Sequence, residues 1–133
     1  MLHTRETLTA AYAALVATVA KMRDAQNDYW AGKARGYNAP HKLHKAIRLE
    51  KEAQVMYKDK IKLQVVFPLV YEPVAKEYAH FMVWVRDLLS WQAQYFKTKD
   101  AKILQKAKLA ETEVDKLIKE YRTTAKSEQL QIF

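Results

Sequence analysis

The sequence predicts an all-α protein, namely an antiparallel four-helix bundle built from two repeated helical hairpins. The first reason is composition, because 50% of the 133 residues are apolar and the chain holds only 2 glycines and 3 prolines. Much of the remainder is Lys, Glu and Gln, which are good helix formers. The second reason is an internal repeat. At this length we expect a single domain, residues 1–133.

The repeat covers two pairs of segments. At a displacement of 66 positions, Leu8, Tyr12, Leu15, Val19, Met22, Gln26 and Tyr29 fall on Val74, Tyr78, Phe81, Val85, Leu88, Gln92 and Tyr95. At a displacement of 61, residues 43–58 fall on residues 104–119. Steps of four and three are typical of the buried face of a helix. The repeat therefore predicts one hairpin over about residues 4–64 and a second over about 72–125.

The first hairpin begins with a helix whose heptad pattern runs from Leu8 to Tyr29. We expect Gly32 to end it by adopting the left-handed conformation, and residues 33–39 to form a loop. Pro40 then starts the second helix, since proline at the first helical position loses no hydrogen bond.

The second hairpin repeats this plan after an apolar connection, Val65 to Tyr71, which we expect to pack against the bundle. Pro73 begins a helix that continues to about Lys97. Asp100 is a good starting residue for the last helix, which we expect to end near Thr124.

Small apolar residues are predicted to line the inner faces of the second and fourth helices and to let helix axes approach closely. These positions are Ala46, Leu49, Ala53 and Met56, with the copies Ala107, Ala110, Val114 and Leu117. Gln26 and Gln92 occupy core positions in both copies, and polar residues at such positions fix the register of helix pairing.

The charge predicts a polyanionic partner. The 23 basic and 15 acidic residues give a net charge of +8, which attracts nucleic acid, RNA or DNA, or an acidic protein. Candidate binding residues are those that differ between the copies, in a longer first loop and on a basic stripe of the second helix: Lys33, Arg35, Tyr37, His44, Arg48, Lys51, Lys58 and Lys62. A neutral loop insertion and an ordinary solvated helix face remain alternatives.

The third helix differs from the first by having large apolar residues on its outer side. Met82, Val83, Trp84 and Trp91 replace Val16, Ala17, Thr18 and Ala25. A helix that is apolar nearly all round is buried on more than one side. The partner is either the connection before this helix or another subunit, and we expect a homo-oligomer.

Few residues are candidates for catalysis or metal binding. The chain has no cysteine, which excludes disulfides and thiolate metal sites and fits a reducing, cytoplasmic location. It has no glycine-rich phosphate loop and no nucleophile elbow, and His41 with His44 alone makes a weak metal site. No apolar run approaches the roughly 18 residues that a membrane span needs. We expect no enzyme, no cofactor, no metal and no membrane association.

One short motif resembles a known family. Arg35 and His41 are separated by five residues, a spacing similar to that of the ribonuclease motif of HEPN domains, which are helical bundles that work as dimers. The resemblance implies His41 as general base and Arg35 as phosphate binder. The chain departs from the usual pattern in having Gly36 after the arginine and Pro40 within the loop.

The sequence thus favours a non-catalytic accessory or adaptor protein that is associated with nucleic acid and oligomeric. In architecture and charge only, such a bundle resembles the accessory variability determinants of diversity-generating retroelements and the small subunits of CRISPR effector complexes. The alternative is a structural or assembly protein of a phage or another multi-subunit particle, with the apolar side of the third helix carrying the function. A HEPN-like ribonuclease is the remote alternative.

Overall fold

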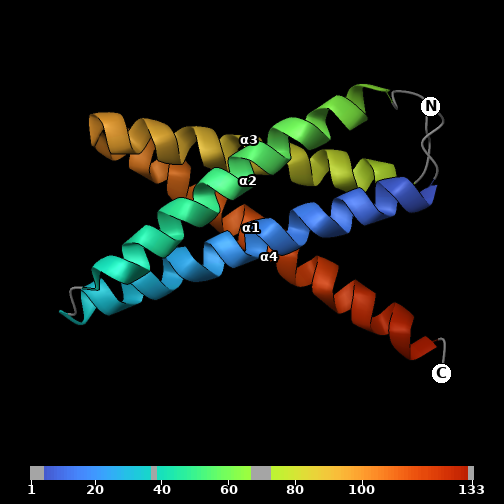
Figure 1. Ribbon diagram of the computed structural model, residues 1–133, viewed down its shortest axis with the longest axis horizontal. Helices are drawn as coiled ribbons and strands as arrows, with labels where there is room; N and C mark the ends of the chain where they lie inside the picture. Colours follow the sequence, from blue (N-terminus) through green and yellow to red (C-terminus); the bar gives the residue numbers. More distant parts are fainter. Residues whose placement is uncertain (1–4, 37–38, 67–72, 132–133) are drawn as a thin grey trace.

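A computed structural model of the chain describes residues 5–36, 39–66 and 73–131, with side chains for 9–36, 39–60 and 76–124. The described residues form four helices and no strand (Figure 1). The helices are α1 (Arg5–Ala34), α2 (Pro40–Val66), α3 (Pro73–Thr98) and α4 (Ala101–Gln131). The predicted all-α class and the number of helices are confirmed.

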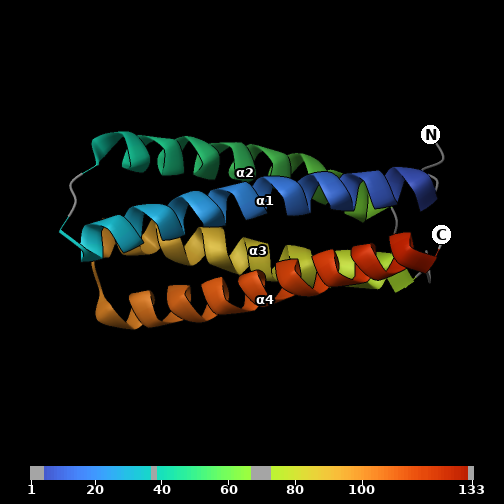
Figure 2. The same ribbon diagram turned by 90° about the horizontal axis from the view of Figure 1, so that it is seen from below.

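The helices pair as two hairpins. α1 packs along α2, and α3 packs along α4, while the contacts between the hairpins are fewer. Figure 1 shows that the helices of each hairpin diverge from their connection, and Figure 2 shows one hairpin stacked on the other. α1 and α3 run in the same direction, so the α1–α2 and α3–α4 connections lie at the same end of the bundle. An approximate twofold rotation about the long axis relates the two hairpins.

The core contains the residues that the repeat matched. Leu15, Val19 and Met22 of α1 are buried, as are their equivalents Phe81, Val85 and Leu88 of α3. Tyr12 stacks on its own equivalent, Tyr78, with ring centroids 5.2 Å apart and an angle of 16° between the planes. Equivalent residues therefore meet near the twofold axis, as a duplicated hairpin requires.

The inner faces of α2 and α4 carry small side chains as predicted. Ala46, Ala53, Ala107 and Ala110 are all buried, and they let each helix approach its larger-faced partner closely. Leu49 and Val114 are buried beside them, whereas Met56 and Leu117 are only partly buried. Each large apolar side chain removed from water contributes about 1.5–3 kcal/mol, so these repeated positions supply much of the driving force for folding.

The end of α1 corrects one prediction. The helix continues through Gly32 to Ala34, because glycine can adopt helical backbone angles as well as left-handed ones. The left-handed residue that ends the helix is Gly36, with φ of 85°, and its N–H donates to the Lys33 carbonyl at 3.0 Å. The first loop is therefore two residues shorter than predicted.

The α3–α4 connection is a tight turn. Lys99 adopts a positive φ of 55°, and its N–H donates to the Tyr95 carbonyl at 2.8 Å. Asp100 caps α4 as predicted, since its carboxylate accepts a hydrogen bond from the Lys102 N–H at 2.8 Å. α4 then runs past Thr124 to Gln131, because residues 125–131 are mostly good helix formers.

Four predictions fall outside the residues or side chains that the structure describes. They are the packing of the Val65 to Tyr71 connection, the side chains of Tyr37 and Lys62, and the burial of the first matched pair, Leu8 and Val74.

Candidate nucleic-acid interface

The two connections bring most of the unbalanced charge to one end of the bundle, on the left in Figures 1 and 2. We call this region, residues 29–48 and 95–108, the loop end. It contains 10 of the 23 basic residues and 1 of the 15 acidic residues, which leaves 13 and 14 for the remainder of the chain. The loop end thus has a net charge of +9 and the remainder has −1. Essentially all of the excess positive charge lies on one end.

The basic side chains of the loop end face solvent. Lys42 is partly buried and forms an ion pair with Asp28 at 3.3 Å, and Lys108 lies 4.0 Å from Glu111. The others are exposed and have no ion pair within the part of the chain that is described: Lys33, Arg35, Lys45, Arg48, Lys97, Lys99, Lys102 and Lys106. Unpaired, exposed cations are available to phosphates.

Aromatic side chains alternate with these cations, and their arrangement repeats. Lys33 Nζ lies 5.2 Å from the ring centroid of Trp30 and 6.0 Å from that of Tyr29. At a displacement of 66, Lys99 Nζ lies 5.1 Å from the centroid of Phe96 and 5.2 Å from that of Tyr95. Trp30 and Phe96 are each 48% exposed. Each hairpin therefore presents one half-exposed ring beside a lysine.

The structure brings part of the predicted binding set to the loop end. Lys33, Arg35, His44 and Arg48 belong to it and are exposed. Lys51 lies just beyond it on α2, and Lys58 lies further along the same helix. Glu52 and Asp59 are exposed among these residues, so the α2 stripe is less uniformly basic than the loop end.

Sequence reasoning missed Trp30 of the first hairpin and its match Phe96, together with the basic residues of the second hairpin, Lys97, Lys99, Lys102, Lys106 and Lys108. Two signals could have found them. In two consecutive hairpins both connections lie at the same end, and the pattern Tyr-aromatic-x-x-Lys occurs at residues 29–33 and again at 95–99.

A buried polar network lies behind the loop end. Gln26 and Gln92 each donate to the side-chain oxygen of the other at 3.1 Å. Each also donates to a glutamate of its own hairpin, Gln26 to Glu50 at 2.7 Å and Gln92 to Glu111 at 3.1 Å. Glu50 and Glu111 are equivalent in the repeat. The two glutamines, which were predicted to fix the register of helix pairing, thus form hydrogen bonds between the hairpins.

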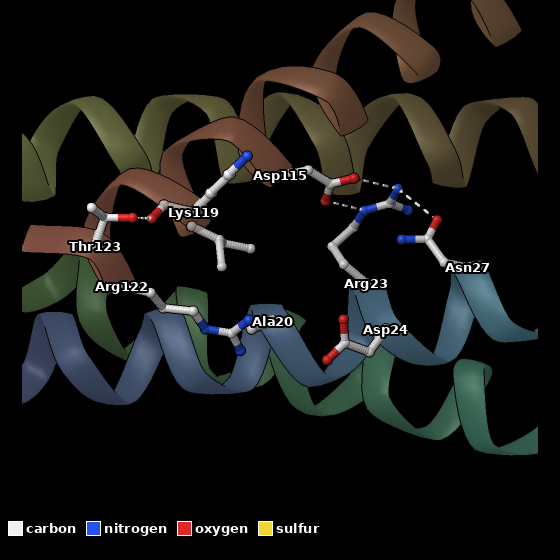
Figure 3. Close-up of a pocket in the computed structure, with 9 residues that line it drawn as sticks. Ala20, Arg23, Asp24, Asn27, Asp115, Lys119, Arg122 and Thr123 are labelled. Atoms are coloured by element: carbon white, nitrogen blue, oxygen red, sulfur yellow. Dashed lines mark hydrogen bonds and ion pairs between the residues drawn. The ribbon is translucent and has the colours of Figure 1, made fainter. Parts of the chain in front are cut away.

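A buried arginine breaks the symmetry of this network. Arg23 is 5% exposed and points toward α4 (Figure 3). Its Nε and Nη2 donate to the two carboxylate oxygens of Asp115 at 2.8 and 3.0 Å. Its Nη1 donates to Gln26 Oε1 and lies 3.7 Å from Glu111. Arg23 therefore neutralises the two carboxylates on the α1–α4 side of the bundle.

On the α2–α3 side, no arginine among the described residues takes the place of Arg23. A groove of about 180 Å³ between these helices is lined partly by Glu50, Leu89 and Phe96. Within the described residues no cation lies within 4.0 Å of Glu50, which differs in this respect from Glu111. Burial raises the pKa of Glu50, and the hydrogen bond from Gln26 opposes this effect only in part.

The predicted interface residues of α3 occupy different environments. Met82 is 2% exposed in the core of the single chain, because its position faces the other helices, so it is withdrawn from the predicted interface. Val83 is 44% exposed. Trp84 is partly buried against the core, and Trp91 lies under Lys106 Nζ at 4.5 Å.

Arg35 and His41, the HEPN-like pair, lie on opposite sides of the α1–α2 connection, and both are exposed. Among the described residues no group of three or more His, Asp or Glu side chains is placed to hold a metal ion. None of the described helices is long and apolar enough to cross a membrane.

Comparisons with known proteins identify no relative, since no family model, no curated protein and no solved structure matches the chain.

Proposed function

We propose that this protein is a non-catalytic accessory or adaptor that binds single-stranded nucleic acid through the loop end. The observation that carries the proposal is the charge distribution, with a net charge of +9 on the loop end and −1 on the remainder. A field of one sign on one face steers a polyanion toward that face and raises its rate of association. Phosphate contacts also release counterions, which supplies most of the affinity of sequence-independent binding.

The charge of the loop end comes from its side chains and not from the helix termini. α2 and α4 begin there, and α1 and α3 end there. The positive ends of two helix dipoles are therefore offset by the negative ends of the other two. The first turns of α2 and α4 contain no acidic residue, and Asp100 just before α4 is the one acidic residue of the loop end.

Aromatic side chains favour single strands over duplexes. The bases of a duplex are already stacked, whereas those of a single strand are free to stack on protein rings. Trp30 and Phe96 are half-exposed and lie beside Lys33 and Lys99, which can contact the adjacent phosphates. One such ring on each hairpin supports a strand that crosses both connections.

The first test is charge reversal at the α3–α4 turn and the start of α4. We expect the double variant Lys99→Glu, Lys102→Glu to lose affinity for a labelled single-stranded octamer, measured by fluorescence anisotropy at two salt concentrations. The logarithm of the affinity should fall by about 0.7 per phosphate contact for each tenfold rise in salt, and the variant should have the shallower slope. The matched control is Lys116→Glu, Lys119→Glu, which makes the same change on the exposed surface of α4 away from the loop end. Equal losses in both variants would contradict the proposal.

The second test addresses stacking. We expect Trp30→Ala and Phe96→Ala each to weaken binding of the octamer by about 1–3 kcal/mol, the range for a base stacked on an aromatic ring. Leu109→Ala removes an exposed apolar side chain of α4 outside the loop end and should have no effect on binding of the octamer. Loss of affinity with charge reversal but not with these variants would indicate a surface for polyanions in general, including acidic proteins.

The same samples test catalysis. We expect RNA to remain intact on incubation with the protein. Cleavage that disappears in His41→Ala would replace the proposed binding role by a nuclease role.

A further inference from the structure

The two sides of the bundle differ at three equivalent positions around the glutamine and glutamate network. Arg23 corresponds to Leu89 at a displacement of 66, and Lys108 and Asp115 correspond to Ile47 and Gln54 at a displacement of 61. On the α1–α4 side these residues form a closed set of ion pairs around Glu111. On the α2–α3 side both cations are replaced by apolar residues. This leaves Glu50 at a largely apolar groove with no cation within 4.0 Å of its carboxylate among the described residues.

The groove combines three kinds of contact. Ile47, Leu89 and Phe96 supply apolar walls, Glu50 and Gln54 supply hydrogen-bonding groups, and Lys51 supplies a cation. Glu50 Oε1 accepts from Gln26, and each carboxylate oxygen can accept two hydrogen bonds, so the carboxylate has unused acceptor capacity within the described structure. Phe96 and Ile47 also belong to the loop end, so a strand bound there passes the groove.

We propose that this groove holds one unpaired nucleobase of the bound strand and that it prefers guanine. The proposal rests on the proposed function, because the loop end must first bind the strand. A flat ring fits between apolar walls with Phe96 as a stacking surface, and Lys51 is placed to contact a phosphate of the same strand.

The preference for guanine follows from the chemistry of a carboxylate, which only accepts hydrogen bonds. Guanine offers two adjacent donors, N1–H and the 2-amino group, which match the two oxygens of Glu50. Adenine and cytosine each offer one amino group beside an acceptor, and uracil places an acceptor on both sides of its single donor. The Gln54 amide can donate to guanine O6. A groove that bound only phosphate would not be expected to contain a carboxylate, because the two negative charges repel each other.

The test compares octamers of uridine with octamers that carry a single guanosine, adenosine, cytidine or inosine at the centre, by fluorescence anisotropy. A well-placed bidentate pair discriminates bases by about 5- to 150-fold, so we expect the guanosine octamer to bind at least about fivefold more tightly than the uridine octamer. Inosine lacks the 2-amino group and should bind with intermediate affinity. Binding of all octamers with equal affinity would overturn the base pocket and leave the proposed function standing. No binding of any octamer would overturn both.

Two variants assign the preference to the groove. Glu50→Gln keeps an oxygen that can accept from Gln26 and removes the charge, so we expect the guanosine preference to disappear while the uridine octamer still binds. The matched control is Glu111→Gln, the same change at the equivalent position on the other side, which should retain the preference. A preference that survives Glu50→Gln would overturn the proposal.

The second variant uses the chain's own repeat. Leu89→Arg with Gln54→Asp introduces the residues found at the equivalent positions 23 and 115, whose side chains close the α1–α4 side. We expect this variant to retain binding of the uridine octamer and to lose the guanosine preference, because the introduced guanidinium would fill the groove and lie beside the Glu50 carboxylate, as Arg23 lies beside Glu111. Its helix content and unfolding midpoint verify folding, and Glu50→Gln provides the decisive result if this variant fails to fold.

Discussion

Gln26 and Gln92 are hydrogen-bonded to each other in both directions, with each side-chain nitrogen 3.1 Å from the oxygen of the other. They are equivalent residues of the two hairpins, so the contact lies where the twofold axis passes through the core. The side-chain nitrogen of each glutamine also donates a hydrogen bond to a glutamate of its own hairpin. A shift of one hairpin along the other would break both hydrogen bonds between the two glutamines at once.

The first prediction concerns this pair. Gln26→Leu leaves the buried side-chain oxygen of Gln92 and the carboxylate of Glu50 without the donor that Gln26 supplies, so we expect a loss of about 1–3 kcal/mol in the free energy of unfolding, measured with urea. The change in the double variant, Gln26→Leu with Gln92→Leu, should be smaller than the sum of the single changes, because both remove the same hydrogen bonds. Gln94→Leu, at an exposed position of α3, should change stability by less than about 0.5 kcal/mol. Additive effects at positions 26 and 92 would refute the coupling.

The second prediction concerns Arg23. Arg23→Met fills similar volume but, among the described residues, leaves Asp115 without a cation partner and Glu111 with Lys108 alone. Removing one partner of a fully buried pair costs about 3–5 kcal/mol, and the side chain of Asp115 is 40% exposed, so we expect a loss of about 1–3 kcal/mol by urea unfolding. Arg86→Met, which breaks the exposed pair with Asp87, should cost less than about 1 kcal/mol. Similar values for both variants would mean that the buried pair contributes no more than a surface pair.

The third prediction is a dependence of stability on alkaline pH. Burial raises the pKa of Tyr78 from 10.0 to about 12, and burial followed by the charge of Glu77 raises that of the stacked Tyr12 as well. The unfolded state therefore loses these protons first. Stability is fully retained below pH 10 and should fall as the pH rises from 10 toward 12.

Tyr78→Phe isolates this effect. Among the described residues the buried Tyr78 hydroxyl has no hydrogen-bond partner, so its removal should leave stability at pH 7 unchanged or higher. The decline above pH 10 should become shallower than in the unaltered protein, as measured by urea unfolding across that range. Tyr95→Phe, at a partly exposed position, should not change the slope, and identical slopes for all three proteins would contradict the prediction.

The fourth prediction separates the two glycines. Gly32 lies inside α1 with open space around it, so Gly32→Ala should stabilise the protein by about 0.5–1 kcal/mol through helix propensity. Gly36 has a φ of 85°, so Gly36→Ala should destabilise it by about 1–2 kcal/mol. Thermal unfolding of the two variants gives opposite shifts if α1 ends where described. The reverse pattern would restore Gly32 as the end of the helix.

The fifth prediction concerns self-association. We expect the chain to form an oligomer through the outer side of α3, where Val83 is exposed. Val83→Lys should then lower the mass measured by light scattering, because a charge in an apolar interface is costly. Val55→Lys places the same charge at an exposed valine of α2 and serves as the control. An unchanged mass in Val83→Lys would remove this face from the assembly.

The hydrophobic periodicity of the sequence was sufficient to predict the fold. The five matched pairs from Tyr12 and Tyr78 to Gln26 and Gln92 predicted which faces of α1 and α3 are buried, because apolar residues repeat at helical spacing chiefly where one face of a helix is packed against a core. The glutamines at positions 26 and 92 were assigned to pairing for the same reason. What periodicity could not supply was the helix ends, since glycine is compatible with both helical and left-handed backbone, and the choice between Gly32 and Gly36 depends on the geometry of the turn.

The candidate site was only half predictable. Lys33 and Arg35 were found because they lie in the longer loop of the first copy, whereas Lys99 and Phe96 were missed because they match Lys33 and Trp30 and so do not differ between the copies. A comparison of the two copies finds the residues that differ and overlooks functional residues that both copies share. The groove at Glu50 depends on Leu89 and Ile47, residues that are ordinary in sequence and become informative only once Arg23 and Lys108 are seen to neutralise Glu111.

The turn at Lys99 carries a further implication. A side chain with a positive φ is strained by about 1–2 kcal/mol, which a glycine would avoid. Glycine there would relax the hairpin and at the same time delete the ammonium group that lies over Tyr95 and Phe96. This turn therefore retains a positive charge at the cost of a strained backbone. A substitution at position 99 that makes the protein more stable would at the same time weaken its attraction for a polyanion.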